Sequence, residues 1–208
     1  MNFIAKSMSN TKRAAAAIVL AAVCGSVHAG PIGIGAFGGG AQTTTFDGLG
    51  FPFSNAAPLV VNGHTITTDD GTVRYTDFGS SCIANECIGN NTDLGYVDIV
   101  LSTLSERAGA WTGAALPGWN TRADFFNAAD VLLGSVNLVN GGDVALFAGW
   151  EDAGGIARIR FNDLTTNSRI VVVDNLVIER VQVPEPASLA LVALGLAGLG
   201  FSRRKRAT

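Results

Sequence analysis

The sequence predicts an all-β body, folded as an antiparallel β-sandwich, between two apolar terminal segments. Three observations carry this prediction. Glycine is abundant, with 26 in 208 residues, and strand signals outnumber helical ones. Turn signals recur every ~8 to 12 residues, a spacing typical of antiparallel sandwiches. No apolar stripe with the 3.6-residue period of an amphipathic helix runs through the body.

The first strands are expected between residues 59 and 78. In "LVVNGHTIT", Asn62-Gly63 separates two apolar, β-branched runs, and this dipeptide is the strongest short-range signal for a hairpin. Asp70-Gly71 follows in "TTDDGTVRYTDF", ahead of another strand-like run. The pattern therefore predicts a meander over residues 59–78.

The next strand, "YVDIVLSTL", alternates with a period of two. It places Val97, Ile99 and Leu101 on one face and Tyr96 and Asp98 on the other. Turn residues at 140–142 and 152–155 are expected to separate the strands that follow. Those strands are predicted at residues 131–139, 143–150, 156–161 and 170–181.

The first 29 residues are predicted to be a secretory signal peptide that forms an N-terminal helix. Positive charges precede the apolar stretch 14–23, and Val27-His28-Ala29 provides a small-residue cleavage motif. Met8 is an alternative start, because the residues after it already hold enough charge. A lipoprotein signal at Cys24 is a second alternative, although Val23 stands where a small residue is expected.

The last segment, residues 183–208, is predicted to cross the membrane as a helix. Its uncharged run 187–201 spans about 22 Å as a helix, and this is short of the ~20 residues of a usual span. Two flanking features nevertheless favour a membrane segment. Pro184 and Pro186 block a helix on one side, and a cluster of cations stops the span on the other. That cluster is Arg203, Arg204, Lys205 and Arg206.

This three-part tail resembles the PEP-CTERM sorting signal of Gram-negative bacteria. The resemblance covers the motif Pro184, Glu185 and Pro186, the apolar span and the basic end. It implies recognition by exosortase, a membrane enzyme thought to process the signal, in hosts that usually make exopolysaccharide. The resemblance thus assigns the motif to sorting and not to catalysis.

A second resemblance lies within the body, over residues 125–180. The order of "FFNAADVLLGSV", "VALFAGW", "IARIRF" and "VVVDNLVIE" is similar to the jelly-roll domains common in PEP-CTERM surface proteins, which are distantly lectin-like. The resemblance implies a jelly-roll-like sandwich and names no activity.

The body, residues 30–182, is long enough for one domain with a sizeable core. It holds 12 aspartates and 4 glutamates against 7 arginines, so its net charge is −9, whereas the whole chain carries −3. This acidity argues against nucleic acid as a partner, since phosphates demand a basic surface. Divalent cations and neutral polymers are easier partners, and the acidity also maintains solubility.

Cys82 and Cys87 are the cysteines left in the body once the signal is removed. In an exported protein, such a close pair predicts a disulfide closing a small loop. Half of a metal site is the alternative, but no second pair or nearby histidine completes it.

Calcium is the cofactor that the sequence suggests. In lectin-like sandwiches the first and last strands are often neighbours and can share an ion, so Asp47 and Asp174 are the candidate ligands. Asp174 follows four apolar strand residues and needs a partner if buried. Alternatively, it caps a bulge or turn through its own backbone, beside Asn175.

Aromatic side chains are the candidates for binding sugar. Trp119 lies in the Pro-Gly loop "LPGWNTR", where exposure is expected, and is the predicted ligand-binding residue. Trp150 ends a strand and is expected in the core. His64, beside the first hairpin turn, is expected to be exposed and not catalytic.

The sequence therefore predicts a non-catalytic exported protein. It would pass the Sec translocon, stay at the inner membrane until an exosortase-type system processes it, and then serve at the cell surface or in the extracellular matrix. Its expected partner is polysaccharide, bound in an adhesive or structural role. The alternatives are a glycan-active hydrolase, whose paired carboxylates would meet only in space, and a purely structural matrix component.

Overall fold

The computed structural model describes residues 29–77, 82–83, 86–92, 94–114, 118–140, 144–164 and 170–180. Apart from Ala29, the predicted signal peptide and sorting tail lie outside these residues. No helix in the described part is long and apolar enough to span a membrane. The elements are β1 (Ala29–Ile32), the 3-10 helix η1 (Ile34–Ala36), β2 (Gln42–Thr44), β3 (Ser54–Ala56), β4 (Leu59–Val61), β5 (His64–Thr68), β6 (Thr72–Thr76), β7 (Cys87–Gly89), β8 (Tyr96–Ala114), β9 (Trp119–Phe126), β10 (Leu132–Asn140), β11 (Leu146–Asp163) and β12 (Val171–Arg180).

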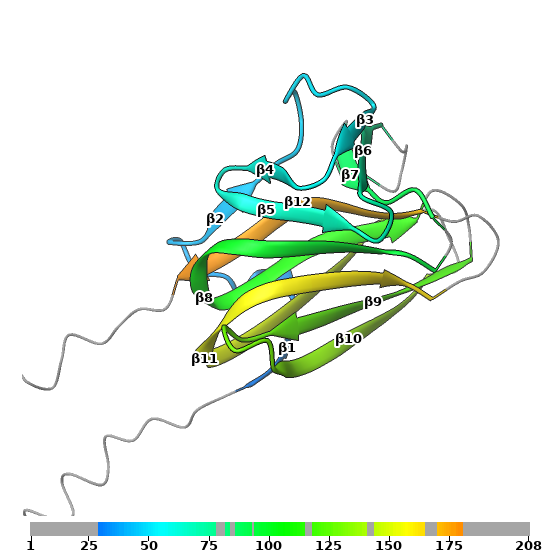
Figure 1. The fold of residues 1–208 in the computed structure, drawn as a ribbon. Coiled ribbons are helices and arrows are strands. Elements are labelled where there is room, and N and C mark those ends of the chain that lie inside the picture. The colour runs from blue at the N-terminus through cyan, green and yellow to red at the C-terminus, as the bar shows by residue number, and fades with distance from the viewer. Residues whose placement is uncertain are drawn as a thin grey trace, which may run out of the picture.

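The strands pair antiparallel and build two packed sheets, so the predicted sandwich is confirmed (Figure 1). The first sheet has the order β4-β5-β8-β11-β9-β10 and uses the first half of β8 and the second half of β11. The second sheet has the order β3-β6-β7-β12-β8-β11-β1 and uses the other halves of these two strands; β2 pairs with β12 beside β7. Apart from Ala29, the first residue of β1, all of these strands lie within residues 30–180.

β8 and β11 are long because each strand runs through both sheets. The register between them shifts between Glu151 and Ile156, where Gly155 has a φ of 90°. The sequence predicted a turn at residues 152–155 that would separate two strands, and this prediction is wrong. The turn residues instead form a bulge within one continuous strand, and such bulges bend a strand and increase its twist.

Arg107 ties the three strands together at this bend. Its Nε lies 2.9 Å from Glu151 Oε2 of β11, and its Nη1 lies 3.1 Å from Glu179 Oε2 of β12. The hydrogen bonds to the two glutamates raise the pKa of Arg107 above its usual value. The bend is thus fixed by a charge cluster on the outer side of the second sheet.

The region predicted as a meander is only half correct. Asn62 and Gly63 both have positive φ, 49° and 81°, and form the predicted hairpin between β4 and β5. After Asp70-Gly71, however, β6 does not pair with β5. β5 pairs with β8 in the first sheet, and β6 pairs with β3 and β7 in the second. This turn therefore carries the chain from one sheet to the other.

The main core lies between the sheets as a connected cluster of apolar side chains, and a smaller cluster surrounds the disulfide at Cys82, Cys87 and Val172. Trp150 of the second sheet stacks on Phe125 of the first, with ring centroids 5.8 Å apart, so its predicted core position is confirmed. The Trp150 ring also reaches β10: a Cβ at Gly134 would lie 2.1 Å from its Cη2. Glycine is therefore required at 134 for the tryptophan to close this side of the core.

His64 is buried, with 3% of its surface exposed, so the predicted exposure is wrong. It stands at the first position of β5, where its side chain turns inward. The backbone N–H of Ser102 donates to its Nδ1 over 3.1 Å, and this bond requires an unprotonated Nδ1. Burial lowers the pKa of His64 below 6.5.

A buried neutral histidine makes stability depend on pH. The unfolded His64 takes up a proton near pH 6.5 and the folded one only at lower pH, so the free energy of unfolding should fall as the pH drops below about 6.5. In His64→Asn, the amide oxygen can accept the Ser102 bond without titrating, so urea denaturation between neutral pH and pH 5.5 should show a shallower loss. Equal slopes for the two proteins would contradict this role.

Candidate functional site

The outer face of the first sheet is polar, although it lies directly over the apolar core. Because side chains alternate along a strand, Val97, Ile99, Ile159, Phe161 and Phe125 point into the core, and their neighbours point outward. We call these outward side chains the polar face: Tyr96, Asp98, Arg122, Asp124, Phe126, Ser135, Arg158, Arg160 and Asn162.

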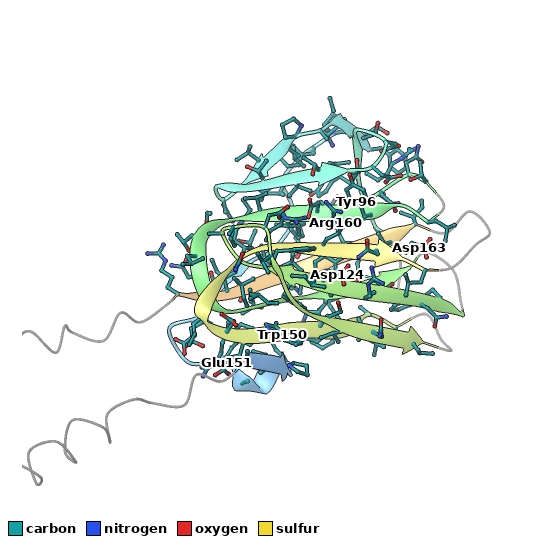
Figure 2. All side chains as sticks on the ribbon, turned by 60° about the horizontal axis from the view of Figure 1, so that its bottom comes forward. Tyr96, Asp124, Trp150, Glu151, Arg160 and Asp163 are labelled. Atoms are coloured by element: carbon teal, nitrogen blue, oxygen red, sulfur yellow. A yellow bond between two sulfur atoms is a disulfide. The ribbon has the colours of Figure 1, made fainter. Side chains whose placement is uncertain are left out.

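One row of polar side chains crosses five strands of this face. The strand registers place Thr67 opposite Asp98, Asp98 opposite Arg160, Arg160 opposite Asp124, and Asp124 opposite Ser135. Figure 2 shows Arg160 and Asp124 on adjacent strands, with Tyr96 beside Arg160. The signs of charge therefore alternate along the row, and polar hydroxyls stand at both ends.

Asp98 organises one half of the row. It is 8% exposed, and its Oδ1 and Oδ2 accept from Arg158 Nη1 over 3.0 and 3.1 Å. Arg160 Nη2 donates to Asp98 Oδ2 over 3.1 Å. Burial is the largest single influence on the pKa of Arg160 and acts to lower it, but the hydrogen bond and charge attraction of Asp98, with the charges of Tyr96 and Asp130, together raise this pKa. One carboxylate thus holds two permanent cations in place.

Asp124 organises the other half. Its Oδ1 accepts from Ser135 Oγ over 2.6 Å, and its Oδ2 accepts from Asn162 Nδ2 over 2.8 Å and from Arg122 Nη2 over 3.0 Å. The Arg122 side chain is nevertheless 41% exposed. Asn162 Nδ2 also donates to the backbone carbonyls of Arg122 and Arg160, so Arg122 is the residue that keeps guanidinium donors beside this fixed acceptor.

Two arginines of the polar face also cover aromatic rings. The guanidinium carbon of Arg158 lies 3.7 Å from the ring centroid of Phe126, and that of Arg160 lies 4.4 Å from the ring centroid of Tyr96. Such cation–π contacts fix the guanidinium planes. With Asp130, which pairs with Arg158, three arginines face three aspartates, so the face is a neutral, rigid array of donors and acceptors within an acidic body.

The tryptophan predicted to bind ligand does not lie on this face. Trp119 opens β9 and is fully buried, so the prediction that it is exposed is wrong. The chain does not keep "LPGWNTR" as one loop: the strand begins at the tryptophan itself, and its side chain points inward. Its role in binding stays a prediction that this burial does not favour.

Trp111 is the tryptophan with a half-exposed side chain. It lies on the outer face of the second sheet, in edge-to-face contact with Phe147, which in turn contacts Phe37, at centroid distances of 5.6 and 5.8 Å. This aromatic cluster is an alternative surface for a sugar ring, but it lacks the polar row of the first sheet.

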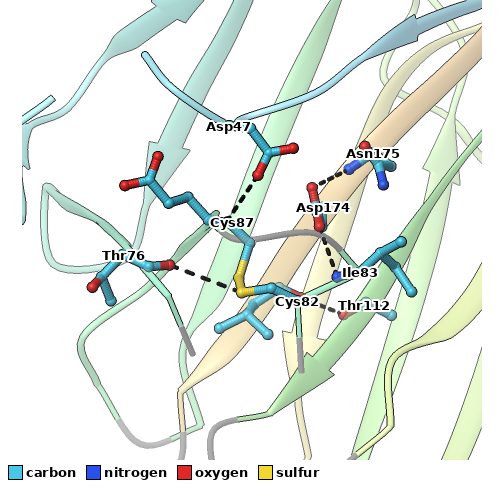
Figure 3. Close-up of a disulfide and its surroundings, with 10 residues drawn as sticks. Asp47, Thr76, Cys82, Ile83, Cys87, Thr112, Asp174 and Asn175 are labelled. Atoms are coloured by element: carbon cyan, nitrogen blue, oxygen red, sulfur yellow. Dashed lines mark hydrogen bonds between the residues drawn. A yellow bond between two sulfur atoms is a disulfide. The ribbon is translucent and has the colours of Figure 1, made fainter. Parts of the chain in front are cut away.

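The predicted disulfide between Cys82 and Cys87 is confirmed. Figure 3 shows how both predicted calcium ligands lie against the segment that it closes. Asp47 Oδ1 accepts from the N–H of Glu86 over 2.9 Å, and Asp174 Oδ2 accepts from the N–H of Ile83 over 2.8 Å. Each acid thus holds one end of the disulfide loop, residues 82–87.

Asp174 is 1% exposed, and its Oδ1 accepts a second bond, 2.7 Å from the N–H of Asn175. Asn175 has a φ of 45° at a register shift in β12. These contacts match the alternative in which Asp174 caps a bulge beside Asn175. Among the described residues, no group of three or more His, Cys, Asp or Glu side chains could hold a metal. Calcium at Asp47 and Asp174 stays a prediction, for which thermal unfolding with Ca²⁺ and with EDTA is the test.

The sequence contains a pattern that belongs to the polar face, but the alternation within each strand does not show which strands lie side by side. Charged side chains occupy every second position in "YVDIV", "RADFF" and "ARIRFN". Each run predicts a strand with a polar outer side. Only the register between strands distant in sequence shows that these charges meet in one row.

Comparison with solved structures finds similar sandwiches at low sequence identity. A family 29 carbohydrate-binding module is 16% identical, with a TM-score of 0.43 over 66% of this chain and 91% of that chain. A TmCBM61 module in complex with β-1,4-galactotriose is 12% identical, with a TM-score of 0.42 over 57% and 90%. The K2 cleaved adhesin domain of Lys-gingipain is 12% identical, with a TM-score of 0.45 over 68% and 98%.

No curated protein matches the chain. Its C-terminal end, however, matches a family model that spans the predicted tail and lies outside the described residues. Residues 182–205 carry the PEP-CTERM protein-sorting motif.

Proposed function

We propose that this chain is a non-catalytic surface protein, exported and sorted by an exosortase-type system, whose polar face binds neutral carbohydrate. The sorting motif supports export and sorting to the cell surface, and the disulfide is consistent with an oxidising compartment. The polar row across five strands carries the proposal of binding. Sugar hydroxyls need donors and acceptors at fixed positions, and fixed groups lose little side-chain entropy on binding.

The neutrality of the face decides the class of ligand. Its arginines and aspartates are paired with one another, so an anionic polymer would have to compete with Asp98 and Asp124 for each guanidinium. A neutral glycan instead uses the donors and lone pairs that these pairs leave open. The carboxylates act here as positioning groups for arginine.

Binding is tested on a glycan array with the body, residues 30–182, and with two single variants. Arg160→Ala leaves Asp98 paired with Arg158, and Arg122→Ala leaves Asp124 bonded to Ser135 and Asn162. Each variant should keep its thermal stability and bind at least about tenfold more weakly, the effect of losing one charge-assisted hydrogen bond.

Trp111→Ala is the matched control, because it removes an aromatic side chain from the opposite sheet. It should leave glycan affinity unchanged. If Trp111→Ala abolishes binding and the arginine variants do not, the aromatic cluster is the site and the polar face is not. If the body binds no neutral glycan, a structural matrix component becomes the better account.

The sorting step is tested separately in a host that has an exosortase-type system. A chain with Pro184, Glu185 and Pro186 all replaced by alanine should accumulate in the inner-membrane fraction, whereas the unaltered chain should reach the cell surface or the medium. The same distribution for both chains would refute the proposed sorting role without affecting the binding proposal.

A further inference from the structure

β10 is an outer strand of the first sheet. Within the part of the chain that the structure describes, it pairs with β9 and ends the strand order. An unpaired edge of this kind presents a row of N–H and C=O groups to any suitable strand. Natural proteins usually protect such edges with lysine, proline, inward charges or a bulge.

Most of β10 lacks these protections. Its sequence from Leu132 to Asn140, "LLGSVNLVN", holds no charged residue and no proline. The register shift between Leu132 and Gly134 protects the beginning of the strand. From Gly134 to Asn140 the pairing with β9 is regular, so seven residues remain as a straight, uncharged edge.

The same edge leaves apolar surface uncovered. Val136 and Leu138 point to the core but are only half-buried, in contrast to the fully buried core side chains of β9 and β11. On the outer side, Val139 is 77% exposed. A strand added beside β10 would satisfy the edge groups and cover these side chains at once.

We propose that the occupant of this edge is a second copy of the chain, paired antiparallel through β10 about a two-fold axis at Asn137. In that register Val136 stands opposite Leu138 of the other copy on the core side. On the outer side, exposed Asn137 stands opposite itself and Val139 stands opposite Ser135. The apolar core-side row is therefore self-complementary, and no charged residue of β10 faces the other copy. A two-fold axis requires this property, because each patch must fit its own copy.

Charge also favours this edge over other surfaces for contact between copies. Each body carries a net charge of −9, so two copies repel one another in general. β10 adds no charge, and the polar face beside it balances three arginines with three aspartates. Pairing at β10 therefore joins the molecules along a strand that brings no charged side chain of its own against its copy.

The pairing would make the two first sheets continuous and place two polar faces side by side. This consequence rests on the proposed function, whereas the pairing itself does not. Two linked sites on one polymer raise the apparent affinity without any new contact to the ligand. A repeating polysaccharide is the kind of ligand that gains from this arrangement.

The test is the mass of the body in solution over a wide range of protein concentration, measured by sedimentation equilibrium. The unaltered body should show a monomer–dimer equilibrium. Asn137→Lys places two like charges directly opposite each other and should give a monomer. Val60→Lys, at an exposed position of the short strand β4 at the other end of the sheet, should dimerise like the unaltered body.

The register is tested by oxidation of single-cysteine variants with the native disulfide intact. Asn137→Cys should form a covalent dimer. Ser135→Cys should not, because the two Ser135 positions lie four residues out of register, about 13 Å apart. A body that stays monomeric at every concentration, a dimer that survives Asn137→Lys, or equal crosslinking of both cysteine variants would overturn the proposal. An unaltered body that dimerises but binds no glycan would refute the proposed function and leave the pairing intact, whereas a monomeric body that binds glycan would refute the pairing alone.

Discussion

Asp98→Ala is expected to lower the free energy of unfolding by about 3 kcal/mol, the cost of removing one partner from a buried ion pair. Arg158 is only 13% exposed and donates to both oxygens of Asp98, while Arg160 shares one of them. Alanine would leave two half-buried guanidiniums without this acceptor. For a body of this size, the melting temperature should fall by roughly 6–12 °C.

Asp130→Asn is the matched control, since it removes a charge from the same arginine and keeps a residue type that tolerates the φ of 61° at this position. The Asp130 side chain is 74% exposed, and an exposed pair contributes less than about 1 kcal/mol. Asp98→Asn, which keeps the shape and one acceptor oxygen, should lose stability between Asp98→Ala and Asp130→Asn. Thermal and urea unfolding of all three variants measure these losses. Similar losses for Asp98→Ala and Asp130→Asn would show that Asp98 does not organise the polar face.

Features of the fold that depend on a few neighbouring residues were predictable from the sequence. Asn62-Gly63 determines its hairpin because both residues adopt positive φ, and the alternation in "YVDIVL" correctly assigns core and solvent faces. The Cys82–Cys87 pair is close enough in sequence that a disulfide needs no long-range information. In each case the local pattern and the tertiary structure require the same conformation.

Features that depend on distant strands were not predictable. The residues at 152–155 have turn chemistry, yet β8 pairs with β11 on both sides of them, so the partner strand overrides the local signal. Trp119 follows a Pro-Gly pair in the sequence but begins a strand, and His64 borders a turn but faces the core. The row from Asp98 through Arg160 to Asp124 depends on two strand registers, which no single stretch of sequence encodes.

Asp174→Ala is expected to cost about 3 kcal/mol of unfolding free energy and to loosen the disulfide loop. The carboxylate accepts two backbone N–H groups, from Ile83 and Asn175, at 1% exposure, and a hydrogen bond to a charged group is worth ~1.5–3 kcal/mol. Alanine removes both acceptors. Cys87 is fully buried and Cys82 nearly so, so loosening should expose the disulfide and accelerate its reduction by a mild thiol under native conditions.

Asp47→Ala separates the two supports of the loop, because Asp47 accepts from the N–H of Glu86 and is only half-buried, in contrast to Asp174. It should cost less than Asp174→Ala and accelerate reduction less. If the acids serve as hydrogen-bond acceptors, Ca²⁺ and EDTA should shift the melting temperature of both variants by the same amount as that of the unaltered body. If instead EDTA lowers the melting temperature of the unaltered body but not of either variant, the two aspartates bind the ion, and the loop is held through it. Reduction at the unaltered rate in Asp174→Ala would show that burial by neighbouring strands, and not this carboxylate, protects the disulfide.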